Sequence, residues 1–368
     1  MPVPLLDLKA QHATIRDEVV AAMMRVVDDQ TFILGDPVER LEQEVAQLSN
    51  TKHAIGCANG TDAILLSLRA LGVGAGDEVI TTPFTFFATA GAIHNVGARA
   101  VFADIDPVSF NLNPDAAAAV QTSKAKAVIP VDRFGQMAEL ERFGGMNIPV
   151  VEDAAQSIGA CREIEGRKTR AGERATVGTF SFFPSKNLGG YGDGGMIVTQ
   201  DDEIALRLRK LRVHGGLRTY HHEMVGYNSR LDALQAVVLS AKLPHLQGWS
   251  AARRDHARYY NDAFADLGGV RTPAIDKRNE SIYNQYTIRV EKRDKLHDHL
   301  KSKGIGSAIY YPVPLHLQPC FDYLGYKKGA FPESEKAAEE VISLPVYPEL
   351  TRAQQDEVVD AVRDFYRH

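Results

Sequence analysis

The apolar and polar positions of the chain predict helices and strands in turn. Apolar side chains recur at helical spacing between Val38 and Leu48 and again between Ile64 and Leu71, which predicts two amphipathic helices. Short β-rich apolar runs follow at 78–81, 99–103, 127–131, 149–152, 177–183 and 196–199. Strands that alternate with helices form a sheet covered on both faces, so the pattern predicts an α/β fold with a mostly parallel sheet.

The pattern changes toward the C-terminus. The elements expected there are a long helix over 231–246, a charged helix near 251–267, a strand near 286–290, a helix near 294–302, a strand near 307–311 and a last helix over 351–365. Thr351 can cap the last helix. We therefore predict a boundary near Gly248, between an N-terminal arm with a large α/β domain over 1–247 and a smaller α+β domain over 248–368.

Length and composition are those of an ordinary globular protein. The 368 residues, 44% of them hydrophobic and 24% charged, are enough for two or three domains with a large core. No stretch approaches the roughly 18 consecutive apolar residues of a membrane span, and the N-terminus lacks the basic-then-apolar order of a signal peptide. The net charge of −5 argues against nucleic acid as a partner. We expect a cytoplasmic protein that binds neither nucleic acid nor membrane.

The cysteines do not form a framework. Cys57, Cys161 and Cys320 are an odd number of widely separated residues, whereas disulfide scaffolds, zinc sites and iron–sulfur sites need paired or closely spaced cysteines. We expect small buried apolar residues in a reducing compartment, and we predict no metal site.

The segment 181–195 carries the most informative chemistry. Its Gly190, Gly192 and Gly195 match a dinucleotide fingerprint, but they precede the expected strand 196–199 instead of following a strand and opening a helix, which argues against a nicotinamide cofactor. What remains is Lys186 on a glycine-rich loop. A lysine in an apolar pocket can lose its proton and form a Schiff base with a carbonyl, although Lys186 taken alone also fits a solvated loop lysine.

Two further segments strengthen that interpretation. Asp153 ends the apolar run at 150–152, where an acid can pair with a protonated ring nitrogen or cap a helix. Gly60 and Thr61 stand at the start of an expected helix. The backbone amides there can hold a phosphate, although a plain helix N-cap would have a similar sequence. Each signal is weak alone. Together they favour a phosphorylated cofactor, because a phosphate site, an acid at a strand end and a lysine on a loop follow one another along the chain.

These residues carry a family resemblance. The sequence resembles the DegT/StrS family of nucleotide-sugar aminotransferases, which use pyridoxal 5′-phosphate (PLP) on the aspartate aminotransferase type of fold, fold type I. The matching motifs run nearly end to end: Leu6-Asp7-Leu8, Phe32-Ile33-Leu34-Gly35, Ala58-Asn59-Gly60-Thr61-Asp62-Ala63, Gly76-Asp77-Glu78-Val79-Ile80, Glu152-Asp153-Ala154-Ala155-Gln156-Ser157, Ser181-Phe182-Phe183-Pro184-Ser185-Lys186 and Asn228-Ser229-Arg230-Leu231-Asp232.

The resemblance implies a role for each matching residue. Lys186 is expected to form the Schiff base with PLP and then, once released, to move a proton between substrate carbon and cofactor. The other cofactor contacts implied are Asp153 to the pyridine nitrogen, Gln156 to the ring hydroxyl, Phe86 on the ring face, Gly60, Thr61 and Ser181 at the phosphate, and Asn228 at the phosphate of the neighbouring subunit's PLP. The last contact implies a homodimer with shared active sites.

Two segments are candidates for the substrate. The stretch 214–222 holds Arg218, Tyr220 and three histidines, a composition suited to an anionic, hydroxyl-rich ligand or to a polar surface loop. The candidate substrate residues are His214, Arg230, Tyr311 and His316. The segment leading into Asn228 resembles members that aminate C3 of the hexose more than those that aminate C4. We expect a UDP-linked 3-keto uronic acid or a dTDP-linked 3-keto-6-deoxyhexose as acceptor and, from the family, L-glutamate as donor.

Alternatives and departures stay open at this point. Amination at C4 is the main alternative, and a PLP-dependent sugar dehydratase is a further one, although those replace the lysine with histidine or recruit an iron–sulfur cluster. A non-catalytic PLP-binding regulator is the third. Phe86 stands where relatives often have Tyr or Trp, and Arg133 stands where many have a small or hydrophobic residue. Arg133 is interpreted as either a substrate-phosphate residue or a surface residue.

Overall fold

A central sheet organises most of the chain in the computed structural model, which describes residues 2–367. Its strands lie in the order β1 (His53–Cys57), β9 (Gly195–Thr199), β8 (Val177–Ser181), β5 (Val151–Asp153), then β4 (Ala125–Val128), β2 (Glu78–Thr81) and β3 (Arg99–Phe102). Parallel bridges from Val128 to Val150 and from Val131 to Asp153 join the two halves. Only β9 runs antiparallel to its neighbours among these strands, so the predicted mostly parallel α/β sheet is confirmed.

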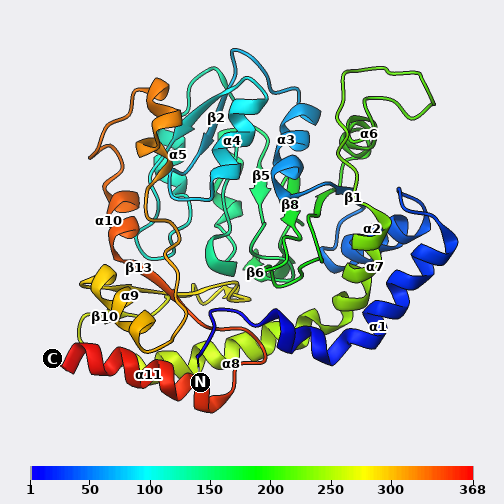
Figure 1. Cartoon of the computed structure of the whole chain (residues 1–368). Helices are drawn as coiled ribbons and strands as arrows, with labels where there is room; N and C mark the ends of the chain where they lie inside the picture. The colour runs from blue at the N-terminus through cyan, green and yellow to red at the C-terminus, as the bar shows by residue number, and fades with distance from the viewer. Residues whose placement is uncertain (1, 368) are drawn as a thin grey trace.

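Helices bury both faces of this sheet (Figure 1). Those around it are α2 (Asp36–Leu48), α3 (Gly60–Ala70), α4 (Phe87–Asn95), α5 (Pro114–Ala119), α6 (Asp202–Leu211) and α7 (Ala233–Lys242). Alternate residues of β9 face two different cores: Ile197 packs with α3, α4 and α6, whereas Met196 and Val198 pack with α2 and α7. Burial on both faces explains why the strands are continuous apolar runs in the sequence.

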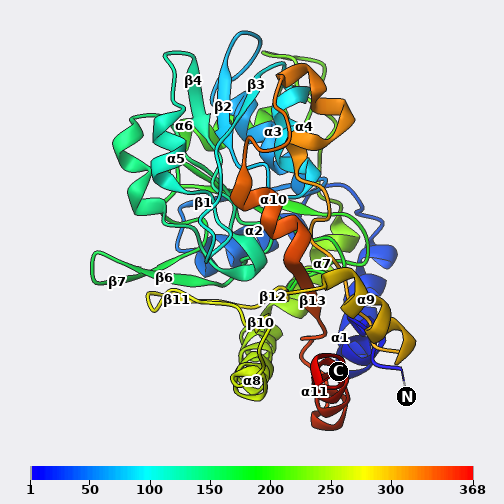
Figure 2. The same cartoon turned by 90° about the vertical axis from the view of Figure 1, so that its left-hand side faces the viewer.

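A smaller α+β unit lies beside the large sheet. Its elements are α8 (Leu246–Phe264), β10 (Val270–Arg271), β12 (Tyr286–Val290), α9 (Arg293–Ser302), α10 (Pro332–Glu340), β13 (Val341–Leu344) and α11 (Arg352–Arg367). Strands β10, β12 and β13 form an antiparallel sheet whose apolar residues pack against α8, α9 and α11. A further sheet pairs β11 (Asn279–Glu280) with the hairpin β6 (Cys161–Ile164) and β7 (Arg167–Arg170), which projects to the left in Figure 2.

The N-terminal helix α1 (Leu8–Asp29) has no counterpart in the sequence prediction. Asp7 caps it by accepting hydrogen bonds from the amides of Lys9 and Ala10. Its buried face packs on α7 and α8 (Figure 1), while much of the rest is exposed. No helix within residues 2–367 is long and apolar enough to cross a membrane.

Two predicted elements differ from the structure. The long helix over 231–246 is interrupted, because α7 ends at Lys242 and a 3-10 turn containing Pro244 precedes α8; proline lacks the amide hydrogen that an uninterrupted helix needs. The strand predicted over 307–311 is wrong: Ala308 alone bridges Ser343 on β13.

The predicted domain boundary at residue 248 falls in the first turn of α8 and stays a prediction. The chain also crosses between the two parts. Leu315, Phe321 and Phe331 pack in the core of the large sheet, whereas Val3 packs in the core of the small unit.

Candidate active site

Asp153 ends β5 at the carboxyl edge of the sheet, where its buried carboxylate is held in place. The Thr89 hydroxyl donates to Oδ2 at 2.8 Å, and the amide of Ala155 donates to Oδ1 at 3.3 Å. Burial raises the pKa of Asp153, and the hydrogen bonds and the positive charges of Lys186 and Arg133 act in the opposite direction. The sequence analysis did not identify Thr89 as a site residue. Its position in the first turn of α4, three residues after Phe86, was the available signal.

Lys186 lies on the loop that follows β8. Its amide donates to Phe183 O at 2.8 Å, and the amide of Gly190 donates to Phe182 O at 2.8 Å, so the loop folds tightly on itself. The pKa of the Lys186 ammonium is lowered to about 8, chiefly by burial and also by the charge of Arg133, against the effect of Asp153. A lysine near that value has a neutral, nucleophilic fraction at neutral pH.

The start of α3 meets the end of β8. Asn59 caps the helix by accepting a hydrogen bond from the amide of Asp62 at 2.8 Å. A Cβ added at Gly60 would lie 2.6 Å from Ser181 Cβ and 3.0 Å from its Oγ, so only glycine fits against Ser181. The first amides of α3, at Gly60 and Thr61, therefore lie close to the Ser181 hydroxyl. This set of hydrogen-bond donors fits a phosphate group.

Phe86 and Gln156 are available to a planar ligand. The Phe86 side chain is 56% exposed and lies 5.8 Å, centroid to centroid, from the ring of Tyr311. Gln156 is buried, and its Oε1 accepts the amide hydrogen of Phe134 at 2.8 Å, which fixes the oxygen and leaves the Nε2 group to donate elsewhere. Lys186 and the four groups described with it thus match the needs of PLP: an amine, an acid, an amide, an aromatic face and a phosphate cradle.

Arg133 is not a surface residue. Its side chain is 1% exposed, and its guanidinium carbon lies 4.9 Å from the ring centroid of Tyr311. The surface alternative from the sequence is therefore wrong.

The candidate substrate residues fall into separate places. His214 and Arg230 line one cavity formed by the loop between α6 and α7, and Figure 1 shows this loop extending away from the rest of the chain. Asn228 is exposed, while Ser229 beside it accepts a hydrogen bond from the amide of Ala58 at 3.3 Å. Tyr311 instead lies with Phe86 and Arg133.

His316 is buried and lies against Glu335 and Phe331. Its side chain is 2% exposed, its Nε2 lies 2.9 Å from Glu335 Oε1, and its ring packs on Phe331 with a centroid distance of 4.8 Å. Burial lowers the pKa of His316, against the effect of Glu335. His316 thus packs against α10, and its contact with substrate stays a prediction.

Comparison with known proteins gives matches over nearly the whole chain. Residues 13–363 match the model of the DegT/DnrJ/EryC1/StrS aminotransferase family. The chain is 51% identical to a protein of Geobacillus stearothermophilus named pleiotropic regulatory protein, with 100% of both chains covered. It is 43% identical to the UDP-N-acetyl-3-dehydro-alpha-D-glucosamine 3-aminotransferase of Acidithiobacillus ferrooxidans, over 98% of this chain and 97% of that protein.

The same result holds for solved structures. The crystal structure of DesV from S. venezuelae in complex with a ketimine intermediate superposes with a TM-score of 0.97 at 39% identity, covering 100% of this chain and 99% of that one. The similarity therefore extends to the backbone fold of the whole chain.

Proposed function

The chain belongs to the DegT/DnrJ/EryC1/StrS aminotransferase family, and we propose that it aminates C3 of a keto-sugar nucleotide with L-glutamate as donor. Members of this family transfer amino groups to sugar nucleotides with PLP as cofactor. The observation that carries the proposal is Lys186, with its lowered pKa, beside Asp153 and the Gly60–Ser181 cradle. The C3 position is supported by the 3-aminotransferase among its relatives and by the segment leading into Asn228.

The residues of the site would hold PLP at each of its polar groups. Asp153 would pair with the pyridine nitrogen, Gln156 would donate to the ring hydroxyl, and Phe86 would cover one ring face. The Gly60 and Thr61 amides and the Ser181 hydroxyl would bind the phosphate. When bound, PLP supplies an electron sink for the carbon that loses a proton.

Asp153 and Lys186 then do different work. Thr89 keeps one Asp153 oxygen oriented, so the carboxylate would hold a proton on the ring nitrogen through its charge. Neutral Lys186 would bind the cofactor covalently and, once freed by the amine of the donor, would take the proton from the substrate carbon and deliver it to the cofactor carbon. A pKa near neutrality suits both tasks, since the base must be free and its conjugate acid must give the proton back.

We also propose that the active unit is a homodimer in which the loop between α6 and α7 reaches the partner's site. Support comes from the exposure of Tyr220 (95%) and Val225 (85%), since such apolar groups favour burial against protein. Ser229 ties the base of the loop to Ala58 beside the phosphate cradle. In this arrangement Asn228 contacts the partner's cofactor phosphate, and His214 and Arg230 meet the substrate diphosphate.

The test is the two half-reactions of the purified, PLP-loaded protein. Addition of L-glutamate is expected to convert the cofactor to its amine form, seen by absorbance, and a 3-keto sugar nucleotide is expected to convert it back. A matched panel of 3-keto and 4-keto nucleotides decides the position. Turnover of 4-keto sugars alone would show that C3 is wrong, and a cofactor band unchanged by both substrates would favour a regulator.

A further inference from the structure

Arg133 carries a buried positive charge that no side chain described by the structure pairs. Its guanidinium carbon lies 5.4 Å from the ring centroid of Phe84, 4.5 Å from that of Phe134 and 4.9 Å from that of Tyr311. Nε and Nη2 are buried and have no hydrogen-bond partner within residues 2–367. Aromatic faces offset part of the desolvation of a cation but satisfy none of its N–H donors.

The carboxylates nearby are committed to other groups. Asp132, the preceding residue, accepts hydrogen bonds from the amide of Ala138 at 2.8 Å and from the Ser157 hydroxyl at 2.6 Å. Asp153 accepts from Thr89 and Ala155. A buried arginine without an anion is costly, so the arrangement is explained if an anion arrives with a ligand.

Arg133 also lies within reach of the reacting groups. Its charge lowers the pKa values of both Lys186 and Asp153, and Tyr311 contacts Phe86 on one side and Arg133 on another. Only the Tyr311 side chain therefore separates a ligand bound over Phe86 from the Arg133 guanidinium.

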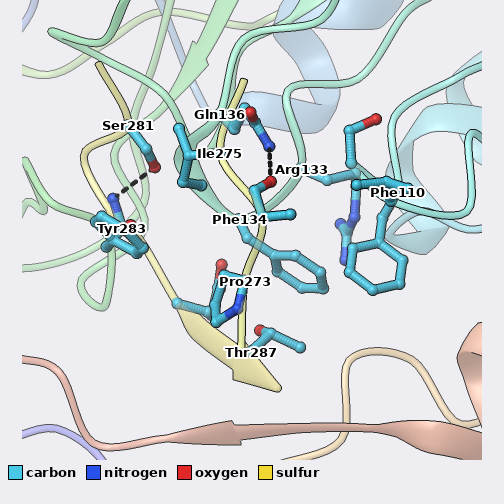
Figure 3. Close-up of a pocket in the computed structure, with 13 residues that line it drawn as sticks. Phe110, Arg133, Phe134, Gln136, Pro273, Ile275, Ser281, Tyr283 and Thr287 are labelled. Carbon is cyan, nitrogen blue, oxygen red and sulfur yellow. Dashed lines mark hydrogen bonds between the residues drawn. The ribbon is translucent and has the colours of Figure 1, made fainter. Parts of the chain in front are cut away.

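The cavity beside Arg133 is not itself the ligand site. Figure 3 shows the Arg133 side chain next to the rings of Phe110 and Phe134 at one side of this cavity. Its volume is about 20 Å³, which is room for about one water molecule. An anion must therefore approach Arg133 from the side of Tyr311.

Resting on the function proposed above, we propose that Arg133 binds a carboxylate group of a reactant. The planar fork of arginine matches a carboxylate, and a small anion close to the reacting carbon fits a buried guanidinium better than a hydrated, nucleotide-linked diphosphate does. Two reactants carry such a group: the amino-acid donor, through its α-carboxylate, and a uronic acid acceptor, through C6.

The experiment compares wild type, Arg133→Met and Arg133→Lys as PLP-loaded proteins in three arms. The first arm is the half-reaction with L-glutamate. The second is the return half-reaction with a UDP-linked 3-keto uronic acid and with its C6-alcohol counterpart. The third is calorimetric binding of succinate, an unreactive dicarboxylate, which needs no turnover and so judges Arg133 even if sugar amination itself fails.

Arg133→Met is expected to weaken succinate binding about 30-fold or more and to raise KM by a similar factor in one half-reaction. A loss with L-glutamate alone identifies the donor carboxylate, whereas a loss with the uronic acid and not with the alcohol identifies the sugar carboxylate. Arg133→Lys is expected to fall between wild type and Arg133→Met, because it keeps the charge without the fork, and it replaces Arg133→Met if that variant does not fold.

Two results would overturn the proposal. One is unchanged succinate binding together with unchanged half-reactions in both variants. The other is an equal loss in every arm, uronic acid and alcohol alike, accompanied by an altered absorbance spectrum or PLP affinity of the free protein. That pattern would mean that Arg133 acts on the cofactor rather than on a reactant carboxylate.

Discussion

Thr89 donates its hydroxyl hydrogen to Asp153 Oδ2 at 2.8 Å, from the first turn of α4 to the end of β5. This bond links the helix that follows Phe86 to the acid proposed for the pyridine nitrogen, so one helix sets both the stacking face and the orientation of the carboxylate.

Removal of that hydroxyl is expected to impair catalysis without unfolding the protein. Thr89→Val keeps the shape but deletes a hydrogen bond to a charged group, a loss of about 1.5–3 kcal/mol, so kcat/KM is expected to fall by about ten-fold or more. Thr89→Ser is expected to restore most of it. Thr85→Val is the matched control, because it removes the neighbouring bond between Thr85 and Thr89 (2.9 Å) but leaves the donor to Asp153; an equal loss in both variants would contradict the role given to Thr89.

Two lysines of the chain have similarly lowered pKa values, and only one is expected to bond to PLP. Burial lowers the pKa of both Lys186 and Lys242 to about 8, but Lys242 donates to Gly189 O at 2.7 Å and lies over the Tyr191 ring. Borohydride reduction followed by peptide mapping is expected to place the cofactor on Lys186 and to leave Lys242 unmodified. Lys186→Ala is expected to fold, to lose the absorbance of the covalently bound cofactor and to be inactive; cofactor found on Lys242 in the wild type would refute the assignment.

A buried carboxyl pair next to the site makes stability depend on pH. Burial raises the pKa of Asp132 to about 6 and that of Glu152 well above its usual value, with the charge of Asp132 adding to the shift at Glu152. The folded state thus holds protons that the unfolded chain releases near its ordinary carboxyl pKa of about 4. The free energy of unfolding is therefore expected to fall as pH rises from about 4 through about 6.

Asp132→Asn tests this by removing one titrating group while keeping an acceptor for Ala138 N. Its unfolding free energy, measured by denaturant titration, is expected to fall less than that of wild type over the same pH range. Asp276→Asn is the control of opposite sign, since its hydrogen bonds from Arg278 lower the pKa of Asp276. That group contributes stability that is lost only as pH falls. A wild-type profile that does not decline between pH about 4 and about 6 would contradict the raised carboxyl pKa values.

The local parts of this architecture were predictable because they depend on local signals. The runs 78–81 and 286–290 are strands with the predicted bounds, Glu78–Thr81 and Tyr286–Val290, since each is a short segment with apolar residues at its centre that is buried along most or all of its length. The order of Gly60, Asp153 and Lys186 along the chain sufficed to suggest a phosphorylated cofactor, and the family resemblance identified it.

The features that were missed depend on distant packing. The helix α1 buries only a narrow stripe against α7 and α8, and a narrow stripe gives a weak pattern. The orientation of His316 toward Glu335 and the burial of Arg133 under Tyr311 arise where segments far apart in sequence meet. Neither residue type nor local spacing carries that information.

The shared active site gives a prediction about mixed dimers. If Lys186 acts in its own subunit and Asn228 serves the partner's cofactor, a dimer of one Lys186→Ala chain and one Asn228→Ala chain has one site with both defects and one intact site. Refolding or co-expression of equal amounts is expected to restore about a quarter of the wild-type activity, because half of the random dimers are mixed and each has one working site. The inactive parents are the baseline.

The control places both substitutions in one chain and mixes it with wild type. Each site of that mixed dimer then carries one defect and is expected to be inactive. The activity of this control mixture is therefore expected to come only from the wild-type dimers that form. No activity in the first mixture together with about half of the wild-type activity in the control, or a fully active monomer in sedimentation, would show that Asn228 serves its own subunit. The exposed side chain of Asn228 and the anchoring of Ser229 to Ala58 would then have to be explained by contacts within a single chain.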